Sequence, residues 1–220
     1  MPETNTPAKI TLDHYEVLTR EDGSPFEIGR GAMGITYKAI DSNLGMTVAL
    51  KVINTRFLNS EMAQQRFKRE ARAAAKLRHR NVASVFHLGA TGESYFYAME
   101  FIDGETVEAL VKREGPQPPL TALRIALQVA RALHAAEQHG LIHRDIKPAN
   151  LMLVREDDEL CVKVIDFGLV KVQDADREDD AAQTVAGAGF FGTPQFASPE
   201  QLREEKLDIR SDIYSLGITL

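Results

Sequence analysis

The feature that most constrains this chain is a polar stretch, His143 to Asn150, followed at Asp166 by the triplet Asp-Phe-Gly. Within the stretch, Asp145, Lys147 and Asn150 place a carboxylate, an amine and a carboxamide close together, and a proline between them stiffens the backbone. Asp145 can accept a proton from a hydroxyl group, whereas Asn150 and Asp166 offer oxygen ligands of the kind that Mg²⁺ prefers. A chance combination in a surface loop is the alternative, and the second acid at this distance disfavours it. The pattern suits the transfer of a phosphoryl group to a hydroxyl.

Composition is that of an ordinary globular chain, because 44% of the 220 residues are hydrophobic and 26% are charged. This length suffices for one large domain or two lobes. The formal charge of −6 gives no electrostatic reason to expect binding to nucleic acid. The six histidines are scattered, without the spacing of a metal site, and the one cysteine, Cys161, lies in an apolar run where a buried thiol is expected. No signal peptide or membrane-spanning run is visible, so the cytosol is the expected compartment.

A glycine pattern at Gly29, Gly31 and Gly34 allows two interpretations. Such glycines open a helix in dinucleotide-binding folds and cover phosphates in other folds. Here residues 35–37 favour a strand, and a second strand is expected at 46–53. Two strands joined through a glycine loop can cover phosphates, since the absence of a Cβ atom lets backbone amides approach closely. The sequence therefore predicts a hairpin.

Lys51 lies in the second of these strands, where a buried ammonium group is costly unless it meets a phosphate or a carboxylate. A solvated strand lysine is the alternative. The following residues, 61–77, predict a helix, and Glu70 borders its apolar face, so we expect Glu70 to pair with Lys51. The residues expected on that apolar face are Met62, Phe67, Ala71 and Ala74.

Further along the chain, strands are expected at 83–88 and 95–101, and helices at 106–114 and 121–139. Leu123, Leu127, Ala130 and Leu133 form an apolar stripe that predicts the buried face of the longer helix. The acidic segment 173–189 predicts a largely disordered loop. Thr184 is the hydroxyl residue of that loop, and a phosphate there could bind Arg144.

The order of these motifs resembles that of eukaryotic-like (Hanks-type) serine/threonine protein kinases, most of all the bacterial branch, over residues 15–220. The resemblance implies an α+β, two-lobed fold. A flexible tail at 1–14 would precede a β-rich N-lobe at 15–101 and a mainly helical C-lobe at 102–220. The family fold continues for several more helices, so the chain is expected to be a fragment whose C-lobe is truncated after the start of its central helix.

The resemblance also implies roles for the polar residues. Asp145 would be the catalytic base, and Asn150 and Asp166 the metal ligands. Lys147 would lie near the γ-phosphate, and Thr193 would orient Asp145 and line the acceptor pocket. Both residues favour Ser and Thr as acceptors over Tyr. The implied reaction is the transfer of the γ-phosphoryl group of ATP, with Mg²⁺ or alternatively Mn²⁺, to Ser/Thr hydroxyls of proteins.

By the same resemblance, Lys51 would bind the α- and β-phosphates and form an ion pair with Glu70, while Asp212 would be a buried acid that braces the backbone at His143. The residues implied around the nucleotide are Ile28, Gly29, Gly31, Gly34, Thr36, Ala49, Lys51, Met99, Glu100, Ile102, Asn150, Met152 and Asp166.

The expected partners are protein substrates and the chain itself, with autophosphorylation at Thr184, and neither nucleic acid nor a membrane segment within these residues. Membrane attachment of a longer parent beyond residue 220 stays open. A non-catalytic, nucleotide-binding scaffold of the pseudokinase type is the alternative function, especially for the 220-residue piece. A dinucleotide-dependent oxidoreductase is disfavoured by the strand that follows the glycine loop.

Overall fold

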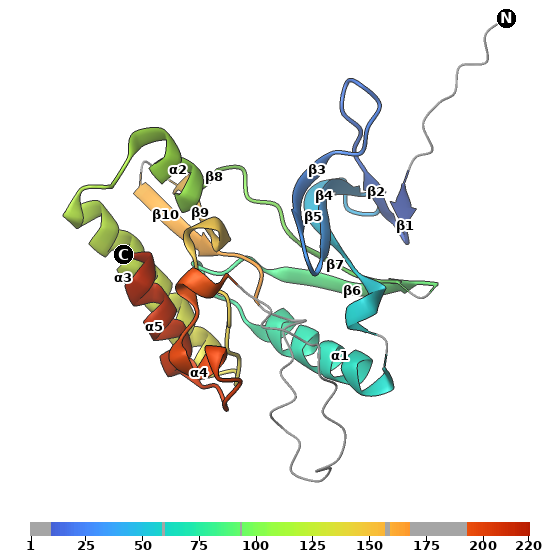
Figure 1. Cartoon of the computed structure of the whole chain (residues 1–220). Coiled ribbons are helices and arrows are strands. Elements are labelled where there is room, and N and C mark those ends of the chain that lie inside the picture. Colours follow the sequence, from blue (N-terminus) through green and yellow to red (C-terminus); the bar gives the residue numbers. More distant parts are fainter. Residues whose placement is uncertain (1–9, 59, 93, 157–158, 168–192) are drawn as a thin grey trace, which may run out of the picture. The chain divides into compact units, whose positions relative to one another are not determined.

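The computed structural model describes residues 10–58, 60–92, 94–156, 159–167 and 193–220 (Figure 1). The chain divides into two compact units. The first holds the described residues up to Ala71 together with Ser84–Ile102, and the second holds Arg72–Ala83 together with the described residues from Asp103 onward. In the described part of the chain, no helix has the length and apolar character needed to cross a membrane.

The first unit is built on one antiparallel sheet, with the strand order β1-β2-β4-β5-β7-β6 and with β3 paired to β4. Its strands are β1 (Thr11–Leu12), β2 (Tyr15–Val17), β3 (Glu27–Gly31), β4 (Gly34–Asp41), β5 (Met46–Ile53), β6 (Val85–Thr91) and β7 (Ser94–Glu100). The hairpin predicted from the glycine pattern is confirmed, and β5 occupies the predicted residues. Strand β1 lies within the stretch for which the sequence predicted a tail. It forms because Thr11 and Leu12 pair with Glu16 and Tyr15 of β2.

The sheet curls around an apolar core formed by its inward side chains. The fully buried members include Tyr15, Leu50 and Phe96. The Tyr15 and Phe96 rings meet edge to face, with 6.1 Å between their centroids, a favourable aromatic geometry. Tyr15 also lies 5.7 Å, ring to ring, from His87 of β6. Strands from the two ends of the strand order therefore approach each other over this core.

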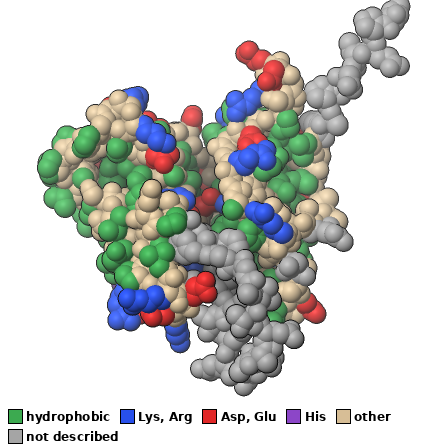
Figure 2. All heavy atoms as spheres, in the orientation of Figure 1, with side chains coloured by type: hydrophobic (Ala, Val, Ile, Leu, Met, Phe, Trp, Pro, Cys, Tyr) green, Lys and Arg blue, Asp and Glu red, His purple; other side chains and the backbone are tan. Residues whose placement is uncertain are grey.

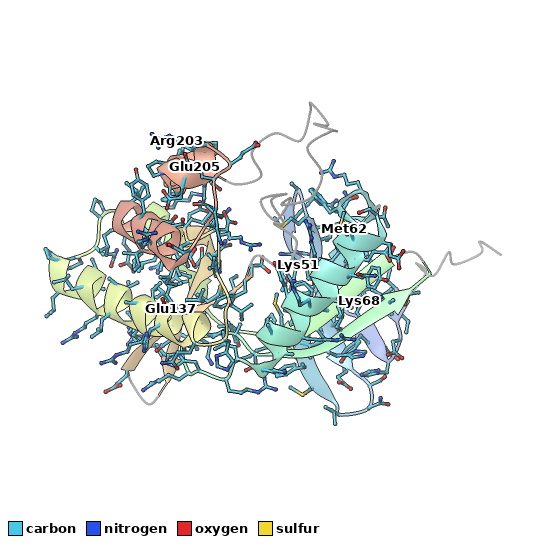
Figure 3. All side chains as sticks on the ribbon, turned by 90° about the horizontal axis from the view of Figure 1, so that it is seen from below. Lys51, Met62, Lys68, Glu137, Arg203 and Glu205 are labelled. Carbon is cyan, nitrogen blue, oxygen red and sulfur yellow. The ribbon has the colours of Figure 1, made fainter. Side chains whose placement is uncertain are left out.

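Helix α1 (Glu61–Lys76) follows a short 3₁₀ turn, η1 (Thr55–Phe57), and begins in the first unit. Phe67 is fully buried and packs edge to face on Tyr95 of β7, with 5.7 Å between the ring centroids. Ala71 and Ala74 are also buried, as predicted, but Met62 (labelled in Figure 3) is 61% exposed. Met62 lies in the first turn of the helix, so the predicted apolar face begins later than the sequence pattern indicated.

The second unit is mainly helical, with a small antiparallel sheet in the order β10-β9-β8. Its helices are α2 (Val107–Glu114), α3 (Pro119–Glu137), α4 (Pro199–Leu202) and α5 (Ile209–Thr219), and its strands are β8 (Glu105–Thr106), β9 (Leu151–Glu156) and β10 (Glu159–Val164). The described residues of this unit also contain the 3₁₀ turns η2 (Pro148–Asn150) and η3 (Pro194–Phe196). Helix α3 begins earlier than predicted because proline is well suited to the first helical position.

The predicted buried stripe of α3 is wrong for three of its four members. Leu123 and Leu127 are 62% and 53% exposed, and Ala130 is exposed as well, whereas Leu133 is buried. The buried residues of α3 are instead Ile125, Val129, Ala132, Leu133 and Ala136, and the helix packs against β10 and α5. The helix carries apolar residues on more than one face, so periodicity alone could not select the buried one. Figure 2 shows apolar side chains exposed on the surface of this unit.

A buried amide network ties the chain after α1 to the rest of the second unit. Asn81 is 1% exposed, and its Nδ2 donates to Gln128 Oε1 of α3 at 2.9 Å and to the Val162 carbonyl of β10 at 2.7 Å. Gln128 Oε1 also accepts from the Val162 amide. Cys161 is buried beside this network, as the sequence predicted. These bonds fix β10, which leads directly to Asp166.

Candidate active site

The polar stretch that the sequence singled out forms a compact loop in the second unit. Asn150 ends the turn η2 and is buried, and its Nδ2 donates to the Asp145 carbonyl at 2.8 Å and to Asp145 Oδ2 at 3.0 Å. The amide nitrogen of Asn150 therefore holds the Asp145 carboxylate in one orientation. The amide oxygen is the atom of this side chain that suits a hard cation.

Lys147 links the same carboxylate to a distant part of the chain. Its Nζ lies 3.1 Å from Asp145 Oδ2 and donates to Thr193 Oγ1 at 2.9 Å. The side chains of Lys147 and Asp145 are only 22% and 18% exposed, so solvent screens this ion pair less than a surface pair. The structure thus brings an acceptor of protons, an ammonium group and a hydroxyl together.

A buried acid holds the backbone that precedes Asp145. Asp212 of α5 is 1% exposed, and its two carboxylate oxygens accept from the backbone amides of His143 at 2.7 Å and Arg144 at 2.8 Å. Burial raises the pKa of Asp212, while these donors and the neighbouring positive charge of Arg144 act in the opposite direction. The family resemblance implied a buried acid that braces the backbone at His143, and Asp212 is buried and bonded to that backbone.

Arg144 needs this support because its φ of +64° lies in the left-handed region, which costs free energy for a residue with a Cβ atom. The charge-assisted hydrogen bond from its amide to Asp212 offsets part of that cost. Its carbonyl accepts from Gln201 Nε2 of α4 at 2.9 Å. Sequence reasoning missed Gln201. The available signal was the sequence Ser198-Pro-Glu-Gln, which predicts a capping box and thus a fixed helix start, and the structure contains that box.

His143 connects the loop to the segment that carries Asp166. The His143 side chain is fully buried, and its Nε2 lies 2.8 Å from the Ile165 carbonyl, while its Nδ1 lies 3.2 Å from the Asp145 amide. A carbonyl accepts and an amide donates, so these partners select the neutral ring with the proton on Nε2. The ring also packs against Phe167, with 4.8 Å between centroids.

Asp166 follows directly, with a φ of +58°, and its side chain is half-buried. The amide of Ile165 donates to the Asn150 carbonyl at 3.0 Å. The backbone segments of Asn150 and Asp166 are therefore fixed to each other within one unit. An amide oxygen and a carboxylate oxygen form a donor set of the hard type that suits Mg²⁺.

The glycine hairpin and Lys51 belong to the first unit. Gly29 and Gly31 lie on β3, and Gly34 begins β4. Lys51 of β5 (labelled in Figure 3) is 9% exposed and stands opposite Thr36 of β4 in the strand register. The burial of Lys51 excludes the alternative of a solvated strand lysine. Its pairing with Glu70 stays a prediction.

Gly34 is required by the hairpin itself. Its φ is +152°, and a Cβ atom at this position would lie 1.9 Å from the carbonyl oxygen of Val52 on β5. Gly31 differs, since a Cβ atom there would meet nothing within 4 Å. The backbone packing thus requires glycine at position 34 but not at position 31.

The remaining residues predicted around a nucleotide lie on both units. In the first unit, Ala49 and Met99 face each other across β5 and β7, and the Glu100 carboxylate accepts from the Ser84 amide at 3.2 Å. In the second unit, Met152 lies on β9. The roles of these residues, and of Ile28, Thr36 and Ile102, stay predictions. Thr184 lies outside the described residues.

Comparison with known proteins identifies relatives. Residues 25–220 match the family described as protein kinase domain. The chain is 41% identical over 196 residues to the serine/threonine-protein kinase pkn3 of Myxococcus xanthus, covering 88% of this chain and 35% of that protein. It is 37% identical over 193 residues to the serine/threonine-protein kinase PknL of Mycobacterium tuberculosis, covering 87% of this chain and 46% of the relative. The chain therefore spans less than half the length of these relatives.

Among solved structures, the crystal structure of the Mycobacterium tuberculosis PknI kinase domain aligns with a TM-score of 0.72 and 27% identity, covering 96% of this chain and 74% of that one. The crystal structure of Rad53 1–466 in complex with AMP-PNP aligns with a TM-score of 0.70 and 26% identity, covering 93% and 46%. The two-lobed α+β fold expected from the sequence agrees with these alignments.

Proposed function

The chain belongs to the protein kinase domain family, among bacterial Hanks-type serine/threonine kinases, and we propose that it transfers the γ-phosphoryl group of ATP to Ser and Thr hydroxyls of proteins. The observation that carries this proposal is the position of Asp145. Its carboxylate is held by Asn150 Nδ2 at 3.0 Å and by Lys147 Nζ at 3.1 Å, and Lys147 in turn contacts Thr193.

In the proposed reaction, Asp145 orients the acceptor hydroxyl and takes its proton as the bond from the hydroxyl oxygen to the γ-phosphorus forms and the bond from that phosphorus to ADP breaks. Lys147 supplies a positive charge beside the transferring group. Thr193 holds Lys147 and, through it, the carboxylate. Alignment and charge neutralisation provide most of the acceleration in phosphoryl transfer, so a fixed arrangement of these groups is what the chemistry requires.

ATP and Mg²⁺ are the cofactors we propose, with Mn²⁺ as an alternative to Mg²⁺. Asn150 and Asp166 would hold the metal ion, because both offer hard oxygen atoms and their backbone segments are hydrogen-bonded. When bound, the ion neutralises charge on the phosphates. Lys51 and the hairpin of Gly29, Gly31 and Gly34 would bind the phosphates, and the relative solved with AMP-PNP supports a nucleotide ligand.

Two features favour a catalytic protein over a non-catalytic scaffold. Lys51, Asp145 and Asp166, which provide the phosphate contact, the base and the metal ligand, are all present. The backbone before Asp145 is also held at the Arg144 amide by Asp212 and at the Arg144 carbonyl by Gln201. A scaffold that only binds nucleotide has no need for an oriented proton acceptor.

The experiment is Mg²⁺-ATP-dependent phosphorylation by the purified chain, of itself and of a generic basic protein. Asp145→Asn is expected to lower turnover by about two to four powers of ten, the usual contribution of a general base. Glu137→Gln, on the exposed surface of α3, is the matched control and should keep wild-type turnover. ATP binding without any phosphoryl transfer by the wild-type chain would favour the scaffold instead.

The chain itself is the second substrate that we propose, with Thr184 as the acceptor. Mass spectrometry after incubation with Mg²⁺-ATP should find phosphate on Thr184, and Thr184→Ala should lower the rate toward the basic protein. Phosphate found only at other positions would contradict this assignment while leaving the phosphoryl transfer itself intact.

A further inference from the structure

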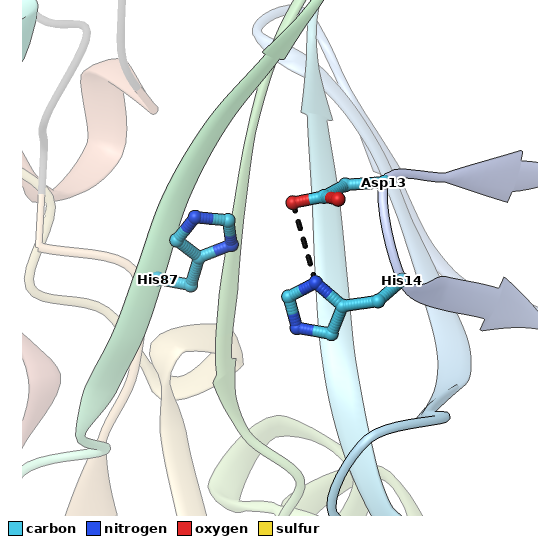
Figure 4. A group of neighbouring side chains, drawn as sticks. All are labelled: Asp13, His14 and His87. Atoms are coloured by element: carbon cyan, nitrogen blue, oxygen red, sulfur yellow. Dashed lines mark ion pairs between the residues drawn. The ribbon is translucent and has the colours of Figure 1, made fainter.

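Metal-binding atoms from three side chains meet in the first unit, at residues that have no part in the proposed phosphoryl transfer. Asp13 and His14 form the turn between β1 and β2, and His87 lies on β6. One ligand atom from each lies within 4.8 Å of the others (Figure 4). We propose that Asp13, His14 and His87 bind a zinc ion.

The first argument is the orientation of His14. Its Nδ1 lies 3.2 Å from Asp13 Oδ2, and its Nε2 lies 3.5 Å from Asp41 Oδ2. Asp41 is 5% exposed, and its other oxygen is held by the backbone amides of Asn43 and Leu44. Histidines that bind metals usually donate the N–H of the other ring nitrogen to a carboxylate, which fixes the tautomer. With the proton on Nε2 facing Asp41, Nδ1 presents a lone pair beside Asp13.

The second argument is the state of His87. Its Nδ1 is buried and has no hydrogen-bond partner among the residues that the structure describes. A buried polar atom without a partner costs free energy and is uncommon in folded proteins. Figure 4 shows the His87 ring beside Asp13 and His14, on the far side of the gap from the β1–β2 turn. A cation in that gap would give the imidazole the partner that it lacks.

The rings are also held in place before any ion arrives. The His14 and His87 rings lie 5.5 Å apart, with 30° between their planes. Both pack against Tyr15, at 4.1 Å and 5.7 Å, and His87 packs edge to face on Phe96. Tyr15 and Phe96 belong to the buried core. The two imidazole rings are therefore held by packing on buried core residues, which reduces the entropy cost of ordering them when an ion binds.

Two imidazoles with one carboxylate favour zinc over Mg²⁺ or Ca²⁺, which prefer oxygen ligands. In a tetrahedral zinc site with bonds of about 2.0–2.1 Å, neighbouring ligand atoms lie about 3.3 Å apart. Asp13 and His14 already meet this separation. The remaining separations, at most 4.8 Å, close with a small shift of the exposed Asp13 turn and the His87 ring. Water would complete the coordination.

Such an ion would join the two ends of the sheet. The β1–β2 hairpin and β6 lie at opposite ends of the strand order and share no ladder hydrogen bonds in the described chain. A ligand that binds only the folded state raises stability by mass action. The proposed role is therefore structural: the ion would link the β1–β2 hairpin to β6 within the first unit.

The test is a calorimetric titration of Zn²⁺ into the full chain without nucleotide, in excess Mg²⁺ so that oxygen-only sites are occupied. Wild-type protein should bind one equivalent, and its unfolding temperature should rise. His87→Gln and Asp13→Asn should each weaken binding by about a hundredfold or more, since even the loss of an outer partner costs 10–100-fold. His139→Gln, an exposed histidine after α3, is the matched control and should bind as wild type does.

A measurement on wild-type protein keeps the proposal testable if a variant fails to fold. Zinc-edge X-ray absorption of the one-equivalent complex should show two imidazole ligands with oxygen neighbours at about 2.0–2.2 Å. The absence of stoichiometric binding, unchanged affinity in His87→Gln and Asp13→Asn, or a spectrum with fewer than two imidazoles would overturn the proposal and leave only the contact between Asp13 and His14 beside the His87 ring.

Discussion

Lys147 Nζ lies 3.1 Å from Asp145 Oδ2, two residues before it in the chain, and the same nitrogen donates to Thr193 Oγ1 at 2.9 Å. A lysine so close to a carboxylate in sequence would ordinarily have many rotamers available. Here the Thr193 hydroxyl reduces that freedom, so one ammonium group is fixed by a partner from elsewhere in the second unit. The orientation of the proposed base therefore depends on a residue that is distant in sequence.

This relationship predicts that Thr193→Ala lowers turnover about tenfold or more, because a hydrogen bond to a charged group contributes about 1.5–3 kcal/mol. Thr193→Ser keeps the hydroxyl and should stay near the wild-type rate. The measurement is initial rates of phosphate transfer at saturating Mg²⁺-ATP. Equal rates for the Ala and Ser variants would show that the bond to Lys147 is not used.

Asp212→Asn should destabilise the protein, because an amide can accept only one of the two backbone N–H groups and turns its own donor toward the other. We expect the free energy of unfolding to fall by about 1–3 kcal/mol, the cost of leaving a buried donor unsatisfied. Urea unfolding measures this change. Asp208→Asn is the control, since Asp208 caps α5 from an exposed position and Asn caps helices equally well. A loss of the same size in both variants would contradict the bracing role.

Two of the hairpin glycines, Gly31 and Gly34, should respond differently to alanine. Gly34→Ala places a Cβ atom 1.9 Å from the Val52 carbonyl oxygen, so we expect a large loss of unfolding free energy or a chain that does not fold. Gly31→Ala meets no atom within 4 Å and should keep wild-type stability. If the loop covers phosphates, Gly31→Ala should weaken ATP binding even though its stability is unchanged. Thermal unfolding and nucleotide titration together separate the two effects.

The pH dependence of stability should reveal the contact between Glu200 and Ser211. The Ser211 hydroxyl donates to Glu200 Oε1 and lowers the pKa of Glu200 below its ordinary value of 4.5. A lowered folded pKa means that the unfolded chain binds protons first as the pH falls. The contribution is therefore fully present above pH 4.5 and is lost as the pH falls through the folded pKa.

Ser211→Ala tests this sign. The difference in unfolding free energy between wild type and variant should stay constant at neutral pH and shrink below pH 4.5, leaving only a pH-independent remainder. Urea unfolding at a series of pH values gives this difference directly. A difference that grows as the pH falls would contradict the assigned direction.

Local chemistry made part of this architecture predictable from sequence. The glycine hairpin, the burial of Cys161 and the grouping of Asp145, Lys147 and Asn150 in one polar loop could be inferred from residues close together in the chain, where turn geometry and strand propensity decide the structure. Helix α3 shows the limit. Its apolar residues lie on more than one face, and only the tertiary contacts with β10 and α5 select the face that is buried.

Contacts between distant residues were harder to foresee. Gln201 reaches the Arg144 carbonyl across 57 positions, and the local pattern at residues 198–201 predicts the helix start but not this bond. His14 and His87 looked scattered because metal-ligand spacing is a local signal. They meet only because the sheet curls until its two ends face each other over Tyr15. Asp212 could be assigned through the family resemblance but not from its own surroundings in the sequence.

The bonds from Asp212 to the backbone before Asp145 also have a consequence for the order of events during synthesis. The accepting carboxylate lies 69 positions after the His143 amide that it binds. A ribosome releases the chain from its N-terminus, and domains fold as their residues emerge. The sheet of the first unit can form early, but the loop that carries Asp145 has to wait for helix α5 to leave the exit tunnel. The growing chain should therefore form the sheet that carries the glycine hairpin before it forms the loop around Asp145.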